Sequence, residues 1–244
     1  RSTHCISSAA SDVYKRQVIS GVDSPPDWGA DDFIVTPKLD GAAISILYGG
    51  GEFQKALTRG DGIEGLDITH NIRHLVPEQI EYEGVLQVSG EVVAPKTIPN
   101  ARNYAAGALN LKSEEEFLER NINFIAYDAQ PAITATWTGA MNNLLFLGFG
   151  TVQNVQDGVY PTDGEVYRLD SYKKFETLGY TAHHPRGAFA LKEQKKGVVT
   201  QLLDVDWQVG KSGVVSPVAI LAPIKIGDAV VERATLHNIE YIRG

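Results

Sequence analysis

Residues 33–48 read Phe33-Ile-Val-Thr-Pro-Lys-Leu-Asp-Gly-Ala-Ala-Ile-Ser-Ile-Leu-Tyr48, and they place Lys38-Leu-Asp-Gly41 between two short apolar runs. The runs over 33–36 and 43–48 predict buried strands, because they are rich in β-branched and aromatic residues. Gly49-Gly-Gly51 then predicts a tight turn into a third strand over 53–58. A lysine is therefore expected at the junction between two buried strands.

The rest of the chain mixes helical and strand patterns without strict alternation, which favours an α+β fold over a doubly wound sheet. Helices are expected over 67–75, 104–109, 137–147 and 172–178, with one more starting at Ser113, and strands over 85–93, 122–127, 165–169 and 187–191. From residue 198 onward the chain is β-rich, which predicts the start of a small barrel. The expected organisation is a tail over 1–17 that is non-native or disordered, a main domain over 18–196 and a truncated barrel over 197–244.

Composition excludes several classes of protein. The 244 residues carry 22 Lys and Arg against 30 Asp and Glu, a net charge of −8, and a single cysteine. One cysteine excludes an internal disulfide framework and a multi-cysteine zinc site, and it fits a reducing compartment such as the cytoplasm. No apolar run is long enough for a membrane span. The acidic balance argues against binding nucleic acid through overall charge, but it leaves room for a local basic site.

Lys38 is the residue on which the predicted chemistry depends. A lysine at the edge of a buried strand can lose its proton and act as a nucleophile. Asp40 is expected on the same face of the extended chain, and Gly41 would let the backbone approach a ligand closely. Further charged residues accompany it along the chain. Arg59 follows the hairpin strand, Glu91 lies within the strand over 85–93, Asp163 precedes the strand over 165–169, and Lys192 ends the run Ala188-Phe-Ala-Leu-Lys192. No metal site is expected among the protein's own side chains.

These residues lie in stretches that resemble the adenylation domain of NAD-dependent DNA ligases. KLDGAAISILY over 38–48 and TRGDGIEGLDITHNIRHLVP over 58–77 resemble its first motif and the segment that follows. The later motifs resemble SGEVVAPK over 89–96, ARNYAAGALN over 101–110, TDGEVYR over 162–168 and HHPRGAFALK over 183–192. The stretch over 207–238 resembles a barrel segment specific to the NAD-dependent branch, and the likeness as a whole runs from about Phe33 to Gly244.

The resemblance implies a nucleotidyltransferase domain of antiparallel sheets with flanking helices, followed by a partial OB-fold. Lys38 would attack the α-phosphate of NAD to form Lys–AMP, and the AMP would then activate the 5′-phosphate of nicked double-stranded DNA in replication and repair. Mg²⁺ and basic side chains would offset the developing charge. The implied cofactor-binding residues are Thr36, Lys38, Asp40, Gly41, Arg59, Glu91, Asp163, Arg168 and Lys192. Among them, Arg59, Arg168 and Lys192 would supply positive charge, Glu91 would hold the ribose hydroxyls, and Asp40 and Asp163 would order cations or the lysine.

Three departures from the family pattern bear on these roles. Thr36 stands where a glutamate that contacts adenine is usual, Arg168 replaces a lysine, and Glu165 occupies a usually apolar position. Together they suggest a compact, divergent member, possibly from a bacteriophage. An ATP-dependent ligase or capping-type nucleotidyltransferase, and a non-catalytic nucleic-acid-binding pseudoenzyme, remain as alternatives. The chain is expected to be a monomeric fragment that is inactive alone and needs flanking domains or a partner chain.

Overall fold

A computed structural model describes residues 17–19, 26–29, 32–59, 65–180, 185–192, 197–209, 213, 215–226 and 229–236. The chain divides into two compact units, Arg1–Gln194 and Lys195–Gly244, and each is considered by itself. The predicted tail lies outside the described residues except for Gln17, as do residues 60–64 and 183–184 of the motifs. Among the described residues, no helix has both the length and the apolar composition needed to cross a bilayer.

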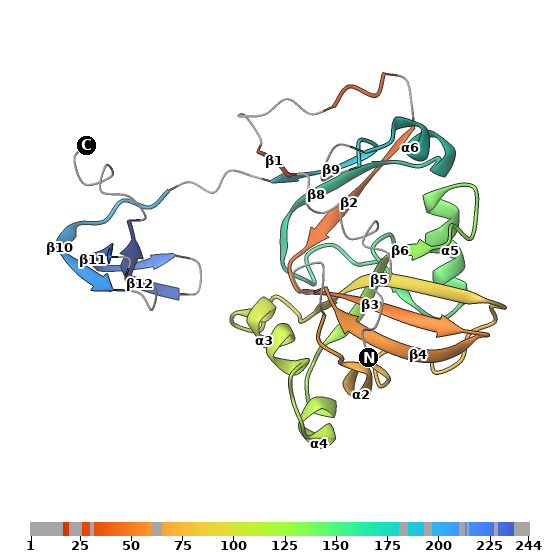
Figure 1. Cartoon of the computed structure of the whole chain (residues 1–244), viewed down its shortest axis with the longest axis horizontal. Coiled ribbons are helices and arrows are strands. Elements are labelled where there is room, and N and C mark those ends of the chain that lie inside the picture. The colour runs from red at the N-terminus through yellow and green to blue at the C-terminus, as the bar shows by residue number, and fades with distance from the viewer. Residues whose placement is uncertain are drawn as a thin grey trace. The chain divides into compact units, whose positions relative to one another are not determined.

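The first sheet of the larger unit carries the lysine. Its four strands, in the order β1-β9-β8-β2, are β1 (Gln17–Ile19), β9 (Ala188–Lys192), β8 (Thr162–Leu169) and β2 (Phe33–Leu39). β8 is antiparallel to both β2 and β9. It begins at Thr162, so Asp163 lies inside the strand and not ahead of it as the sequence suggested. This sheet therefore brings the ends of three chain segments to one place (Figure 1).

The second sheet is built on the predicted hairpin. Its order is β4-β3-β5-β6-β7, with β3 (Ala42–Gly49), β4 (Glu52–Thr58), β5 (Val85–Val93), β6 (Asn123–Gln130) and β7 (Gly150–Thr151). Gly50 and Gly51 connect β3 to β4, and both have positive φ, at 59° and 82°. Glycine adopts that backbone conformation without strain, so the turn predicted from the glycine run is confirmed.

The helices cover the sheets, and the last three of them each follow a residue whose hydroxyl accepts a backbone hydrogen bond. They are α2 (Thr69–Ile72), α3 (Ala101–Ala108), α4 (Glu114–Leu118), α5 (Trp137–Phe146) and α6 (Tyr172–Leu178). The hydroxyl of Ser113 accepts a hydrogen bond from Glu116 N–H at 3.3 Å, which confirms the predicted cap of α4. The α2 helix is shorter than the predicted 67–75, because residues after Ile72 form turns.

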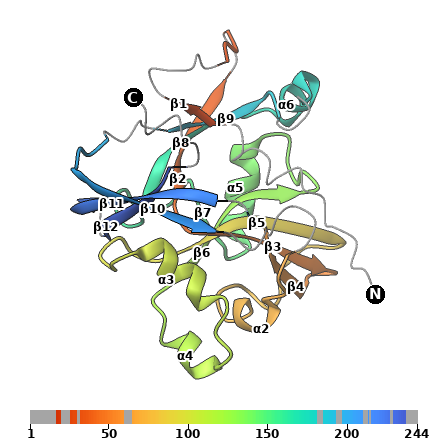
Figure 2. The same ribbon diagram turned by 60° about the vertical axis from the view of Figure 1, so that its left-hand side comes forward.

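Two hydrophobic cores hold the larger unit together. The larger core lies against the second sheet and the helices α3 and α5, and its fully buried side chains include Tyr48, Ile46, Trp137 and Met141. The smaller core joins the first sheet to α6 through Val166, Leu169, Phe175, Ala188 and Ala190. Figure 2 shows α6 beside β9 and α3 beside the second sheet. Each sheet thus has its own helical support.

The smaller unit contains one antiparallel sheet in its described part. Its order is β10-β11-β12, with β10 (Leu202–Val209), β11 (Val215–Ile226) and β12 (Ala229–Thr235). These strands do not close into a barrel. The described chain is therefore a mixed α/β structure made mostly of sheets, as the sequence predicted.

Two glycines allow the packing around Lys38 to be tested with one kind of substitution. A Cβ at Gly41 would clash with the carbonyl oxygen of Val92, whereas a Cβ at Gly107 in α3 would meet nothing within 4 Å. We expect Gly41→Ala to lower the free energy of unfolding by about 2 kcal/mol, because β5 must shift. Gly107→Ala should raise it by up to about 1 kcal/mol through helix propensity. Urea denaturation measures both values, and equal effects would contradict the clash.

Candidate active site

Lys38 lies in the wall of a cavity of about 420 Å³. Residues from both sheets of the larger unit line this cavity. Seven of the nine predicted site residues line it: Lys38, Asp40, Gly41, Arg59, Glu91, Asp163 and Lys192. Leu39, Ala42, Ala43, Arg102, Ala106 and Tyr127 complete the wall. Residues far apart in the sequence are therefore brought together here, and all seven belong to the motifs whose resemblance implied a shared site. We call this space the Lys38 cavity.

On the side of the first sheet, one carboxylate lies between two ammonium groups. The Nζ atom of Lys38 donates to Oδ1 of Asp163 at 2.7 Å, and Nζ of Lys192 lies 3.1 Å from Oδ2. Burial favours the neutral acid, but the hydrogen bonds and charges of the two lysines outweigh it and lower the pKa of Asp163. The strand order explains the arrangement, since β8 carries Asp163 between β2 and β9.

Gly164 makes that arrangement possible. Its φ is +143°, and a Cβ there would clash with the carbonyl oxygen of Leu191 in β9. A glycine is therefore required where β8 comes closest to the strand that carries Lys192. Asp163 and Gly164 are needed together, because the glycine lets the strands approach closely enough for Asp163 to contact both lysines.

Glu91 forms the opposite wall and has an unusual environment. It belongs to β5, directly across from Ala43 in β3. Burial raises the pKa of Glu91 to about 7, although the charges of Lys38, Arg59 and Arg102 and a hydrogen bond from the Gly41 backbone all act to lower it. A carboxyl with such a pKa exists in both protonation states near neutral pH.

Gly41 connects the lysine segment to Glu91 through its backbone. A Cβ at Gly41 would clash with the carbonyl oxygen of Val92 in β5, and the backbone N–H of Gly41 donates a hydrogen bond to the Glu91 carboxyl. Gly41 also lines the Lys38 cavity. The absence of a side chain therefore allows close packing on β5, and the expectation that the backbone here approaches a ligand stays a prediction.

Arg102 is a cavity residue to which sequence reasoning assigned no role. It lies in the first turn of α3, and its Nη1 is 3.4 Å from Oδ1 of Asp40. A helix N-terminus disfavours cations, because the backbone N–H groups there carry partial positive charge. An arginine in the first turn is therefore unfavourable for the helix itself. This indicates that Arg102 is present for another reason, such as its contact with Asp40. Tyr127 of β6 was also missed, and burial strongly raises the pKa of its phenol.

Thr36 and Arg168 lie away from the Lys38 cavity. Thr36 is buried and lines a separate cavity of about 350 Å³ together with Glu165. Arg168 is 6% exposed and lies 3.7 Å from Oδ1 of Asp128, which is 8% exposed, and its guanidinium packs against the rings of Trp137, Tyr172 and Phe175. The pair joins β8 of one sheet to β6 of the other. Among the residues that the structure describes, Nε of Arg168 has no hydrogen-bond partner.

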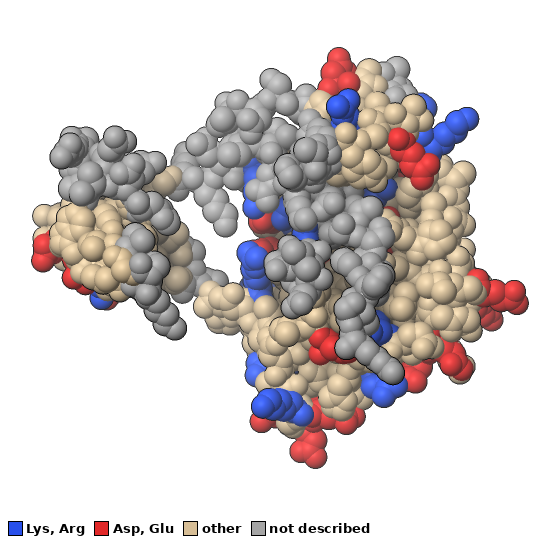
Figure 3. All heavy atoms as spheres, in the orientation of Figure 1, with Lys and Arg blue, Asp and Glu red and all other residues tan. Residues whose placement is uncertain are grey.

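The surface of the larger unit carries basic side chains despite the acidic total. On the face shown in Figure 3, Lys and Arg side chains gather along the left-hand edge of this unit, while Asp and Glu lie mostly toward its right and lower edges. A local basic region of this kind attracts phosphate groups even when the net charge is negative.

The Arg168–Asp128 pair can be tested through stability. Replacing Arg168 by Met would leave Asp128 as an uncompensated buried charge, so we expect the free energy of unfolding to fall by about 3 kcal/mol. Arg168→Met combined with Asp128→Asn should recover most of that loss, because the charge is gone. Chemical denaturation of the wild type, the two single variants and the double variant checks this, and additive losses in the double variant would show that the two side chains do not interact.

Glu91 should make stability depend on pH in a defined direction. Its pKa of about 7 in the folded protein exceeds the ordinary 4.5, so the folded state holds the proton more tightly and stability falls as pH rises between these values. Glu91→Gln removes the charge, so its melting temperature should exceed that of the wild type at pH 8 and approach it at pH 5. Glu176→Gln, at an exposed position, is the control, and a pH-independent difference for Glu91→Gln would refute the assignment.

Comparison with known proteins identifies the family to which the chain is related. The model of the NAD-dependent DNA ligase adenylation domain matches residues 27–159, and that of the NAD-dependent DNA ligase OB-fold domain matches residues 199–244. A solved structure of mycobacterial DNA ligase D complexed with ATP and MES aligns with 93% of this chain and 74% of that one. Its sequence identity is 11% and its TM-score 0.39, which is too low to support an inference.

Curated relatives agree with the family models. The chain is 32% identical to a DNA ligase of Pseudomonas putida (strain GB-1) over 94% of its own length and 35% of that protein. It is also 32% identical to a DNA ligase of Anoxybacillus flavithermus, over 86% of this chain and 38% of the relative. It thus spans little more than a third of these relatives. Because the adenylation-domain model alone covers more than half of the residues, the chain belongs to the family of NAD-dependent DNA ligases.

Proposed function

We propose that this chain takes AMP from NAD onto Lys38, as the first step of DNA nick sealing. The observation that carries the proposal is the Nζ atom of Lys38, held 2.7 Å from Asp163 in a cavity that three further cations line. Those cations are Arg59, Arg102 and Lys192. A nucleophilic amine surrounded by positive charge suits attack on a phosphate, where negative charge develops in the transition state.

The proposed step balances as a simple displacement. The unprotonated amine of Lys38 attacks the α-phosphorus of NAD, a P–N bond forms, and the P–O bond to nicotinamide mononucleotide breaks. The amine's proton is released, and the mononucleotide leaves with the bridging oxygen and its electron pair. Asp163 orients the amine before the attack, and Lys192 holds Asp163 in place. Glu91 is suited to accept hydrogen bonds from the ribose hydroxyls when it is ionised.

The later steps follow from the family. The AMP would pass to the 5′-phosphate of a nick in double-stranded DNA, and the neighbouring 3′-hydroxyl would displace it. Residues 197–244 would contribute the first strands of an OB-fold, in keeping with the three antiparallel strands described there. We propose that the protein acts as a monomer in the cytoplasm, and that Thr36, which lines the neighbouring cavity, influences recognition of the base.

The described side chains that line the Lys38 cavity do not form a set of ligands for Mg²⁺. Asp163 is paired with two lysines and Asp40 with Arg102. In the part of the chain that the structure describes, no group of three or more acidic, histidine or cysteine side chains could hold a metal ion. Any Mg²⁺ that takes part would be held mainly by substrate phosphates and water, as that ion commonly is. No step of the proposal is assigned to it.

Labelling of Lys38 tests the proposed function. The chain, in excess and supplied with the flanking domains that it is expected to need, in cis or as a partner chain, is incubated with NAD labelled in its adenylate phosphate, and acid-labile label on protein is counted. We expect label on the wild type, and at least a hundredfold less on Lys38→Ala and on Lys38→Arg, because a guanidinium stays protonated and cannot attack. Lys173→Ala, on the exposed face of α6, is the control that should label normally.

Other outcomes of the same assay would contradict the proposal. Label from ATP but not from NAD would indicate an ATP-dependent ligase or capping-type enzyme. Label on Lys38→Ala at the wild-type level would move the nucleophile elsewhere. Absence of label from both nucleotides would favour a non-catalytic nucleic-acid-binding scaffold.

A further inference from the structure

Residues 67–71 do not line the Lys38 cavity, yet they are bonded to both segments that supply its arginines. We call this segment the bracket. Its bonding side chains are those of Asp67, Thr69 and Asn71. Thr69 and Asn71 lie in the short helix α2 two positions apart, where side chains do not share a face, so one short stretch can contact two different elements.

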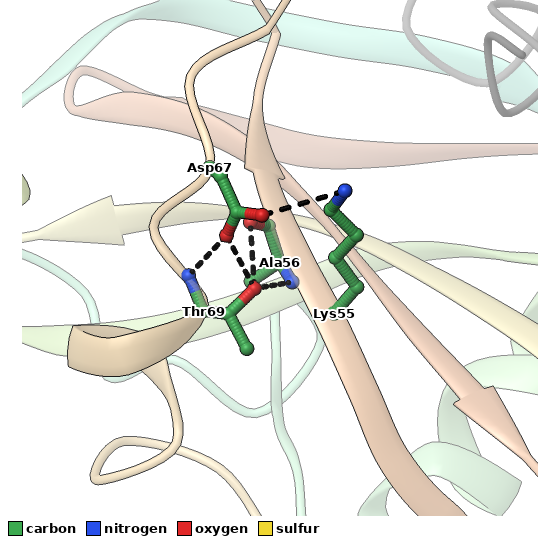
Figure 4. A network of polar contacts seen from close by, with 4 residues as sticks. All are labelled: Lys55, Ala56, Asp67 and Thr69. Atoms are coloured by element: carbon green, nitrogen blue, oxygen red, sulfur yellow. Dashed lines mark hydrogen bonds and ion pairs between the residues drawn. The ribbon is translucent and has the colours of Figure 1, made fainter. Parts of the chain in front are cut away.

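The first contact of the bracket is with β4 (Figure 4). Oδ1 of Asp67 accepts hydrogen bonds from the hydroxyl and the N–H of Thr69, at 2.6 and 3.1 Å, and its Oδ2 lies 3.4 Å from Nζ of Lys55. The same Thr69 hydroxyl accepts a hydrogen bond from Ala56 N–H at 3.0 Å. Lys55 and Ala56 belong to β4, so the bracket is fixed to that strand by a charge and by hydrogen bonds.

Further hydrogen bonds connect the start of the bracket to Arg59, which follows β4 in the chain. The N–H of Thr58 donates to the carbonyl oxygen of Leu66, and the N–H of Leu66 donates to the Thr58 hydroxyl, both at 2.9 Å. The N–H of Arg59 donates to the carbonyl oxygen of Ala43 at 3.1 Å. The backbone at Arg59 is thereby fixed between the residues leading into the bracket and β3.

The second contact of the bracket is with the end of α3. Nδ2 of Asn71 donates to the carbonyl oxygens of Leu109 and Leu111, at 3.1 and 2.9 Å, and the side chain is 4% exposed. These carbonyl groups follow the last turn of α3, whose first turn carries Arg102. Asn71 therefore fixes the helix that places the second arginine in the cavity wall.

We infer that the bracket is a positioning element, which sets Arg59 and Arg102 relative to each other so that both charges meet the phosphate of a bound nucleotide. The position of each guanidinium depends on the backbone of its arginine, because a long side chain reaches a defined point only when its backbone is fixed. The inference rests on the proposed function, since it assumes that the cavity receives the adenylate phosphate. It assigns the positioning role to Thr69 and Asn71, which do not line the Lys38 cavity.

The test compares two ligands that differ only in the phosphate. Dissociation constants of AMP and adenosine are measured by calorimetry for the wild type, Thr69→Val, Thr69→Ser and Thr177→Val. We expect Thr69→Val to weaken AMP about tenfold, the size of a lost charged hydrogen bond, and to leave adenosine within about twofold. Thr69→Ser keeps the hydroxyl and should bind as the wild type does. Thr177→Val, which removes a similar hydroxyl–carbonyl bond in α6, is the matched control.

A double-mutant cycle separates positioning from general loss of structure. In an Arg59→Ala background, Thr69→Val should have no further effect on the ratio of AMP to adenosine affinity, and in an Arg102→Ala background Asn71→Leu should have none. Additive effects in both cycles would overturn the inference. So would equal losses for AMP and adenosine, or no loss at all.

The proposed function fails in a different way. If the wild type binds AMP no more tightly than adenosine, the cavity does not recognise phosphate, and the function falls together with the inference. If the wild type prefers AMP and Thr69→Val retains that preference, the function stands and the bracket has no positioning role.

Discussion

The contact of Asp163 with two ammonium groups is the interaction on which the rest of the site depends. Two like charges near one point repel each other, and the carboxylate between them makes their proximity possible. The contact needs β8 to run between β2 and β9, and it needs a glycine after Asp163 so that the strands come close enough. The topology of the first sheet is thus tied to the chemistry of one acidic side chain.

The second sheet contributes Glu91 to the site, and the burial of this carboxyl lowers the stability of the fold. Glu91 is buried where its charge is poorly solvated, and three cations only partly compensate for this. Such a carboxyl is of little use to folding, because a neutral side chain of the same shape would fit with less cost. Its presence is better explained by a ligand that needs an acceptor in the cavity, a pattern typical of functional sites.

Much of this could be predicted from local patterns. The hairpin at Gly50-Gly51, the cap at Ser113 and most of the strands follow from short-range rules of turn and helix chemistry, and the charged residues that gather around Lys38 lie in motifs that resemble those of one family. What could not be predicted depends on pairing between distant segments. Arg102 enters the cavity because α3 packs on β5, and Arg168 turns away from it toward Asp128 because β8 and β6 belong to different sheets. No window of sequence contains that information.

The paired hydrogen bonds between Thr58 and Leu66 have a consequence for how this part of the chain can change during evolution. They join the chain at the end of β4 to the residue that precedes the bracket, so the two ends of the intervening segment are held together. The free-energy cost of closing such a segment grows only slowly with its length, by about 0.6 kcal/mol for each doubling. A change of chain length between Thr58 and Leu66 is therefore expected to cost little while these two hydrogen bonds remain, and β4 and α2 would keep their places.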